Sequence, residues 1–227
     1  MGRRNLQDEI LQKRGRRPAG ATRIDLYTSR SVKLLEALQH LLREGDPEDT
    51  TCEAEFTRYF PVALVACVEG YFRMAIADLI DRGPPFIDRV VKLRDINVST
   101  EVAVAIQTRK ISLGEYISHF ITISSLEDIC RALSALLDMD FLDRLLSSRF
   151  HLYRDEPPIQ LEEARGDFVV AVRDLFHTRH MLCHEFVPDL SVDNGEMMRA
   201  FTATDVLISL SEMIIWAEEG EDVEDVG

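Results

Sequence analysis

An arginine and three histidines stand close together in the segment DFVVAVRDLFHTRHMLCHEF, residues 167–186. On a helical wheel Arg179 falls in the middle of an apolar stripe, where leucine would be usual. An unpaired buried charge costs several kcal/mol or more, so this guanidinium needs a carboxylate, a carbonyl, water or a ligand anion. Arg179 is therefore either half of a structural ion pair or a group that binds an anion.

The three histidines occupy one face of the same helix, about 100–160° round from Arg179: His177, His180 and His184. Three interpretations are open. Imidazolium groups near a helix C-terminus are favoured by the helix dipole. The spacing also suits a zinc site completed by Cys183 or Glu185, and hence a zinc-dependent hydrolase. In the third interpretation Arg179 and His184 belong to one catalytic site.

The six residues from Arg179 to His184 resemble the RxxxxH motif of the HEPN superfamily, helical ribonucleases common in prokaryotic toxin–antitoxin and antiviral defence systems. In that family the residue after the arginine is usually polar, and His180 fits. The earlier segment ALVACVEGYFRMAIADLI resembles the apolar helix of the RiboL-PSP-like branch. Some members carry, two positions after the histidine, a tyrosine that a partner nucleotidyltransferase modifies; here that position is Phe186.

The resemblance implies an all-α, HEPN-like helical bundle with extra short helices. It implies a metal-independent RNA endonuclease without a cofactor, in which Arg179 clamps the phosphate, His184 transfers protons and His180 assists. Such a protein is expected in a toxin or antiviral defence setting, with a cognate inhibitor or antitoxin protein as a further partner. The alternative is a non-catalytic helical module that binds a protein or a nucleotide.

The chemistry of these side chains suits that activity. Cleavage of RNA by its own 2'-hydroxyl needs a base for the hydroxyl proton, an acid for the leaving 5'-oxygen and a cation for the charged phosphorane. Imidazole, with an unperturbed pKa of about 6.5, performs either proton transfer near neutrality. Arginine supplies a permanently charged fork that matches phosphate oxygens. No metal ion is required.

A homodimer is expected, because the resemblance implies two RxxxxH helices that face each other across a two-fold axis. The wheel favours the same arrangement, since Arg179 and His184 lie about 140° apart, too far round for a compact site on one helix. The final helical segment offers apolar surface for the contact: Met197, Met198, Phe201, Leu207, Leu210, Met213 and Ile214. Alternatively, these residues close the core of a single subunit.

Glu69 and Arg73 stand four residues apart, in the favourable acid-first order, on an otherwise apolar segment. One interpretation is a simple pair within the helix. The other is that Glu69 orients Arg179 from behind, because such supporting contacts commonly fix catalytic side chains. Asp174 is expected to be a solvated partner of Arg173 or of another Lys or Arg.

Helical periodicity covers the chain between its ends, and no alternating strand pattern appears. Helices are predicted at about 23–44, 61–81, 86–94, 101–109, 113–122, 125–137, 140–148, 160–186 and 196–219. The helix 61–81 is apolar around most of its circumference and should be central and buried, with Pro61 in its first turn. Ser125 and Asp128 fit a capping box.

Charge divides the chain into a basic flexible arm (1–22), one helical domain (23–219) and an acidic tail (220–227). Residues 1–23 carry seven Lys or Arg and two acids, whereas the whole chain has a net charge of -14 and a pI near 4.9. A binder of any nucleic-acid backbone relies on a broad basic field, so contact with RNA must be local, at the arm or at the site.

A cytoplasmic protein that does not enter a membrane is expected. The N-terminal sequence has charges throughout and no apolar core of a signal peptide. The most apolar stretch, residues 59–80, is interrupted by Glu69, Arg73 and Asp78. The four cysteines lack CxxC spacing and suit reduced thiols: Cys52, Cys67, Cys130 and Cys183.

Overall fold

The protein is all-α, as predicted. The computed structural model describes residues 6–14, 18, 20–44, 50–93, 98–108, 110–150, 159–160, 165–185 and 192–221. Most of these residues are helical, and two short strands, β1 (Arg149–Phe150) and β2 (Ile159–Gln160), pair antiparallel. The arrangement as a HEPN-like bundle stays a prediction.

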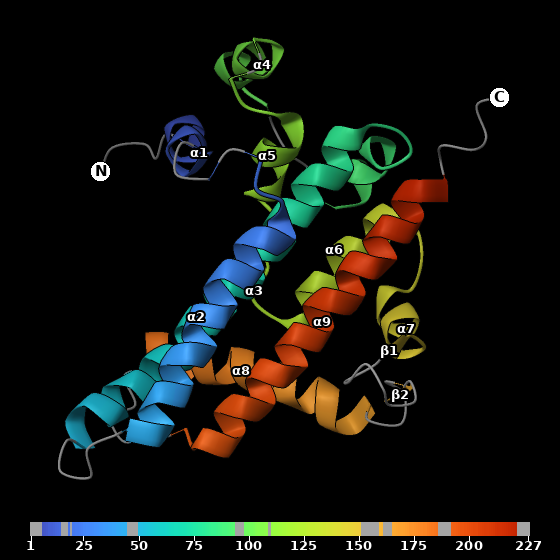
Figure 1. The fold of residues 1–227 in the computed structure, drawn as a ribbon. Coiled ribbons are helices and arrows are strands. Elements are labelled where there is room, and N and C mark those ends of the chain that lie inside the picture. Colours follow the sequence, from blue (N-terminus) through green and yellow to red (C-terminus); the bar gives the residue numbers. More distant parts are fainter. Residues whose placement is uncertain are drawn as a thin grey trace.

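Four long helices form the body of the molecule: α2 (Arg23–Glu44), α3 (Thr50–Arg82), α8 (Arg165–His184) and α9 (Asn194–Glu221). Helices α2 and α3 run side by side, and α9 packs against both. Helix α8 crosses them near the end at which α9 begins, and it contacts α3 and α9 (Figure 1). The candidate catalytic residues of α8 are therefore carried on a helix that is held in place by its packing on α3 and α9.

Shorter helices occupy the other end and one side: α1 (Leu6–Arg14), η1 (Ile87–Lys92, a 3-10 helix), α4 (Thr100–Gln107), α5 (Leu113–Ser118), α6 (Leu126–Leu137) and α7 (Phe141–Leu146). Helix α5 lies so close to α3 that a Cβ added at Gly114 would be 2.1 Å from the Ala77 carbonyl oxygen. The Gly114 amide donates to Asp81 Oδ1 at 2.7 Å, which fixes the crossing.

Helix α3 is the central buried helix, as its apolar circumference predicts. Phe60, Leu64, Phe72 and Ile76 on it are fully buried. The predicted start at residue 61 is wrong, because α3 begins at Thr50 and Pro61 lies inside it. Proline in a helix interior costs about 3 kcal/mol, and burial of side chains on both sides of it offsets that cost here.

A buried polar network ties α2, α3 and α9 together. The guanidinium of Arg23 donates to Glu212 Oε2 at 2.8 Å and to Asp78 Oδ2 at 3.0 Å. The Tyr71 hydroxyl donates to the same Glu212 oxygen. Burial would lower the pKa of Arg23, but the two carboxylates outweigh it and raise the pKa. Charge partners thus satisfy the buried cation at the junction of the long helices.

The expected flexible arm contains a helix. Residues 6–14 form α1, and Ile10 is buried where α1 packs against α5. Burial of this apolar side chain gives the segment a fixed place despite its charged composition. Residues 1–5, 15–17 and 19 of the arm, and residues 222–227 of the acidic tail, lie outside the described residues.

Among the other predicted features, Ser125 caps α6: its hydroxyl accepts from the Asp128 amide at 3.1 Å. Cys67, Cys130 and Cys183 are free thiols, and burial raises the pKa of Cys130 to about 12. The side chain of Cys52 lies outside the described part of the chain.

In the part of the chain that the structure describes, two helices are long and apolar enough to cross a membrane, Glu55–Arg82 of α3 and Asn194–Glu218 of α9. Within their most apolar windows, 67% and 44% are buried inside the protein. A core helix of a soluble protein passes the same test, so the cytoplasmic location stays a prediction.

Candidate functional site

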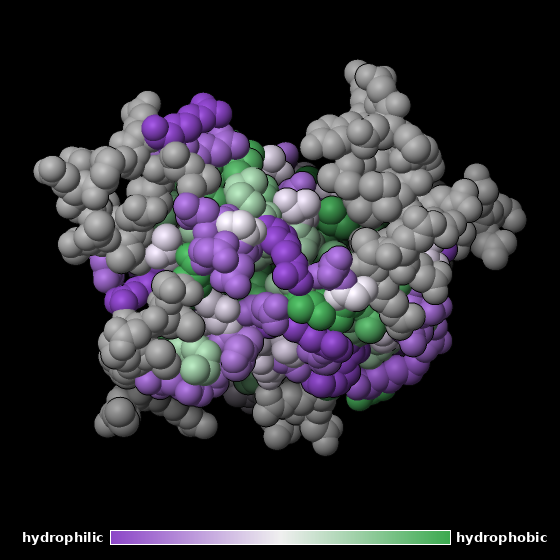
Figure 2. Space-filling model, turned by 90° about the horizontal axis from the view of Figure 1, so that it is seen from below, coloured by the Kyte–Doolittle hydropathy of each residue, from purple (hydrophilic) through white to green (hydrophobic). Residues whose placement is uncertain are grey.

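Helix α8 buries one face as far as Phe176, and none of residues 177–184 is buried. Phe168, Val172 and Leu175 face the core, as the wheel predicts. Cys183, predicted on the same stripe, is exposed because the last turn of α8 extends past the core. Figure 2 views the molecule from the end at which α8 crosses, and hydrophilic residues cover much of the described surface there.

Arg179 pairs with an internal acid. Its Nη2 lies 3.5 Å from Glu69 Oε1 on α3, and the two side chains are 29% and 27% exposed. The pair is half-buried, so each side chain still has a face open to solvent. The structure thus brings together the two residues that the sequence suggested as a positioning pair.

Arg73 turns away from this pair. Its guanidinium donates to the Ser118 carbonyl of α5. Burial lowers the pKa of Arg73, against the opposing effect of the Glu69 and Glu9 carboxylates. Of the two interpretations of Glu69 and Arg73, the contacts favour the second, since Glu69 contacts Arg179 of α8 and Arg73 contacts α5. Arg73 has no contact with the α8 histidines in the described residues.

His180 and His184 lie side by side on the exposed face of α8. Their ring centroids are 5.1 Å apart, with 44° between the ring planes. Nε2 of His180 is 3.7 Å from Glu185 Oε1. Two neighbouring imidazoles provide one group to accept a proton and one to donate a proton within reach of the same substrate.

A cleft of about 290 Å³ separates the start of α6 from α8. We call it the α6–α8 cleft; it is lined by Ser124, Ser125, Leu126, Glu127, Arg173, Phe176, His177, Arg179 and His180. Arg173 Nε lies 2.6 Å from Glu127 Oε1, which anchors that guanidinium at the rim. Two guanidinium groups and two imidazoles thus border one cavity, although the protein as a whole is strongly acidic.

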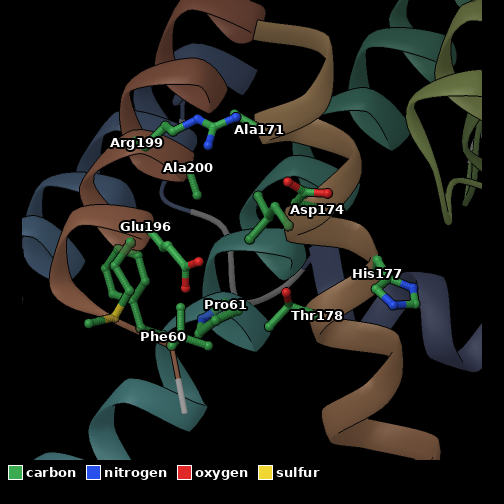
Figure 3. A pocket seen from close by; sticks show the side chains of 12 residues that line it. Phe60, Pro61, Ala171, Asp174, His177, Thr178, Glu196, Arg199 and Ala200 are labelled. Carbon is green, nitrogen blue, oxygen red and sulfur yellow. The ribbon is translucent and has the colours of Figure 1, made fainter. Parts of the chain in front are cut away.

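A second cavity of about 280 Å³ lies on the other side of α8, between α3 and α9. We call it the α3–α8–α9 pocket. Figure 3 shows Asp174 and Thr178 reaching it from α8, and Glu196 and Arg199 reaching it from α9. His177 lines both cavities, so they meet at that residue.

The zinc interpretation finds no assembled site. Among the described residues no three His, Cys, Asp or Glu side chains are grouped so that they could hold a metal ion. His180 and His184 lie side by side near the end of α8, whereas His177 lines the two cavities about one turn earlier.

The apolar residues of α9 mostly close the core of the single chain. Met197, Phe201, Leu207, Leu210 and Ile214 are buried, so the expectation that this surface serves a dimer is wrong for these residues. The physical reason is that α9 packs on α2, α3, α7 and α8 at once. Two large apolar side chains of α9 remain exposed to solvent: Met213 at 50% and Trp216 at 69%.

Sequence reasoning missed Arg173 and the start of α6 as parts of the site. Arg173 and Glu127 are 46 residues apart, and no local pattern links them.

Comparison of the chain with protein-family models, with curated proteins and with solved structures found no match. The HEPN resemblance thus stays a prediction based on Arg179, His184 and the helical context.

Proposed function

We propose that the protein is an RNA endonuclease that cleaves by 2'-hydroxyl transesterification without a metal ion. The observation that carries the proposal is that Arg179 and His180 line one cleft while His184 lies against His180. The proposed phosphate clamp and one proposed proton-transfer group thus border one cleft, and the second imidazole lies beside the first. The cleft brings two guanidinium groups to the surface of a protein with a net charge of -14, each beside a carboxylate: Arg179 beside Glu69 and Arg173 beside Glu127.

The reaction needs three roles. One imidazole takes the proton of the 2'-hydroxyl, whose oxygen attacks the adjacent phosphorus. The 5'-oxygen leaves with a proton from the second imidazole, and the products carry a 2',3'-cyclic phosphate and a 5'-hydroxyl. We assign the proton transfers to His184 and His180, and the stabilisation of the phosphorane to Arg179.

Glu69 contributes by holding Arg179. An arginine side chain loses conformational entropy when it is fixed in one rotamer. Because the Glu69 carboxylate already holds the guanidinium, this entropy is lost before substrate binds. Beside this carboxylate the Arg179 side chain stays 29% exposed and lines the α6–α8 cleft.

A homodimer, a cognate inhibitor protein and a cytoplasmic toxin or defence setting belong to the same proposal. Arg179 faces α3, whereas His184 projects from the last turn of α8, so a second α8 would bring further groups to each site. Mixing inactive Arg179→Ala subunits with inactive His184→Ala subunits is expected to restore activity if the site is shared. If sedimentation showed that the active protein is a monomer, the shared site would be contradicted.

The deciding experiment incubates the purified full chain with defined RNAs in excess EDTA and maps the ends of the products. We expect cleavage to persist and the 5' fragments to carry 2',3'-cyclic phosphate. Loss of cleavage in EDTA with recovery on addition of zinc would support the hydrolase alternative. Tight RNA or nucleotide binding without cleavage would support the non-catalytic module.

A further inference from the structure

The α3–α8–α9 pocket is apolar at its base and ionic at its mouth. Phe60, Leu175 and Met197 line it with buried side chains. Asp174, Glu196 and Arg199 line it with exposed or partly exposed ones. A cavity of about 280 Å³ of this kind suits a small planar ligand whose faces are apolar and whose edges are polar.

The ionic groups of the pocket leave hydrogen-bonding capacity unused. Among the described residues the Asp174 carboxylate forms no hydrogen bond or ion pair, and it is not paired with Arg199. Arg199 donates one long hydrogen bond, 3.5 Å, to the Asp167 carbonyl. Glu196 is engaged at the start of α9, where its Oε2 accepts from the Asp193 amide at 3.3 Å.

A carboxylate and a guanidinium around one cavity fit a ligand with a donor edge and an acceptor edge. Figure 3 shows Asp174 on the α8 side and Arg199 on the α9 side of the pocket. Guanine presents two acceptors, O6 and N7, which an arginine fork matches, and two adjacent donors, N1–H and the N2 amino group, which a carboxylate matches. Adenine, cytosine and uracil have no edge with two adjacent donors.

We propose that the α3–α8–α9 pocket binds a guanine base, with Asp174 accepting from N1–H and N2 and Arg199 donating to O6 and N7. The faces of the base lie against the partly exposed apolar side chains that line the pocket, Val192 and Ala200. An unstacked base bound in a protein pocket is the usual way in which single-stranded RNA is read.

The position of the pocket connects it to the catalytic cleft, and this step rests on the proposed function. Both cavities meet at His177, and Thr178 of the pocket adjoins Arg179 of the cleft along α8. In an RNA strand with a guanine in the pocket, the backbone then passes His177 towards the side of α8 that carries Arg179 and His180. The predicted nuclease cuts next to guanine.

The first test measures binding of nucleosides to the full chain by calorimetry, without any cleavage. Guanosine is expected to bind about tenfold or more tightly than adenosine and than inosine, which lacks the N2 amino group. Asp174→Asn should remove the preference over both nucleosides. Arg199→Gln should weaken guanosine and inosine alike, because inosine keeps O6 and N7, and should therefore reduce only the preference over adenosine. Asp167→Asn, the same change on the same helix at a side chain outside the pocket, should retain it.

The assignment would be overturned if guanosine and adenosine bound equally, or if Asp174→Asn kept the preference for guanosine. It would also be overturned if the pocket bound a simple alkylamine and no nucleoside. End mapping of cleaved RNA separates this result from the nuclease proposal. Cleavage without guanine at the cut and without guanosine binding would overturn the guanine pocket alone. Guanosine binding that depends on Asp174, without any RNA cleavage, would overturn the nuclease alone.

Discussion

Arg179 of α8 and Glu69 of α3 form a half-buried ion pair, with 3.5 Å between Nη2 and Oε1. The contact links the helix that carries the candidate catalytic residues to the most buried helix of the fold. An ion pair in such a position adds little to stability on balance, because desolvation offsets the attraction. Its more important effect is on the direction in which the guanidinium points.

Substitution of Glu69 is expected to impair catalysis more than folding. Glu69→Gln keeps the shape of the side chain but removes the charge that holds Arg179. We expect RNA cleavage to fall by about 10- to 100-fold in kcat, with a smaller change in KM and an unchanged melting temperature to within a few degrees. Glu69→Asp should recover part of the loss.

The matched control is Glu55→Gln, on the same helix at an exposed ion pair with Arg58. It should change neither cleavage nor melting, because exposed pairs contribute about 0–1 kcal/mol. If Glu69→Gln lowered activity only in proportion to a lost folded fraction, a positioning role for Glu69 would be refuted.

Alanine substitution should lower the rate of RNA cleavage far more at Arg179 and His184 than at the neighbouring His177. Arg179→Ala and His184→Ala are expected to lower the rate of RNA cleavage by about 10²- to 10⁴-fold while circular dichroism stays unchanged. His180→Ala should have an intermediate effect, because His180 lines the cleft and contacts His184. His177→Ala should leave the rate of the chemical step nearly unchanged; a loss equal to that of His184→Ala would contradict the assignment of roles among the histidines.

The pairing of Arg179 is a part of the candidate site that the sequence predicts. A charged residue on an apolar stripe needs a partner, and Glu69 interrupts the most apolar segment, so their pairing follows from the cost of buried charge. The adjacency of His180 and His184 follows from the helical repeat. The cleft does not follow, because it depends on where α6 crosses α8, and that is set by packing among residues distant in the chain.

The same contrast holds for the fold. The ends of α2 at Arg23 and Glu44 match the predicted range, since Gly45 and Pro47 follow directly. The start of α3 and the existence of α1 were not predictable locally, because tertiary burial overrides the signals of Pro61 and of a basic, charged segment. The guanine pocket likewise combines side chains from α8 and α9 whose sequence context shows no shared pattern.

Two glycines on the α3–α5 side should respond in opposite directions to alanine. Gly114→Ala places a Cβ against the Ala77 backbone, 2.1 Å from its carbonyl oxygen, so α5 must shift away from α3. We expect a loss of about 1–3 kcal/mol or more in the free energy of unfolding. Gly70→Ala, inside α3 with nothing within 4 Å of the added Cβ, should instead raise stability by about 0.5–1 kcal/mol. Urea titration of both variants measures the difference, and equal effects would contradict the close crossing.

The carboxyl group of Asp128 makes the start of α6, at the rim of the cleft, sensitive to acid. Burial raises its pKa, but hydrogen bonds from Ser124 and Arg131 outweigh that effect and hold the pKa below its ordinary value of 3.8. The Ser124 hydroxyl donates to Oδ2 at 2.7 Å, and Arg131 Nη1 lies 2.8 Å from Oδ1.

Because the folded-state pKa is lower than the unfolded one, the stabilisation by Asp128 is complete above about pH 5 and is lost as the pH falls through the folded-state value. Asp128→Asn should therefore be less stable than the wild type by about 1–2 kcal/mol at pH 7. Urea titrations from pH 7 down to the lowest pH at which both proteins fold should show this difference shrinking below about pH 5. Arg131→Gln, which removes one of the two partners, should shift the acid limb of the wild-type profile upward in pH. A difference between Asp128→Asn and the wild type that is the same at every pH would show that the charge of Asp128 does not stabilise the start of α6.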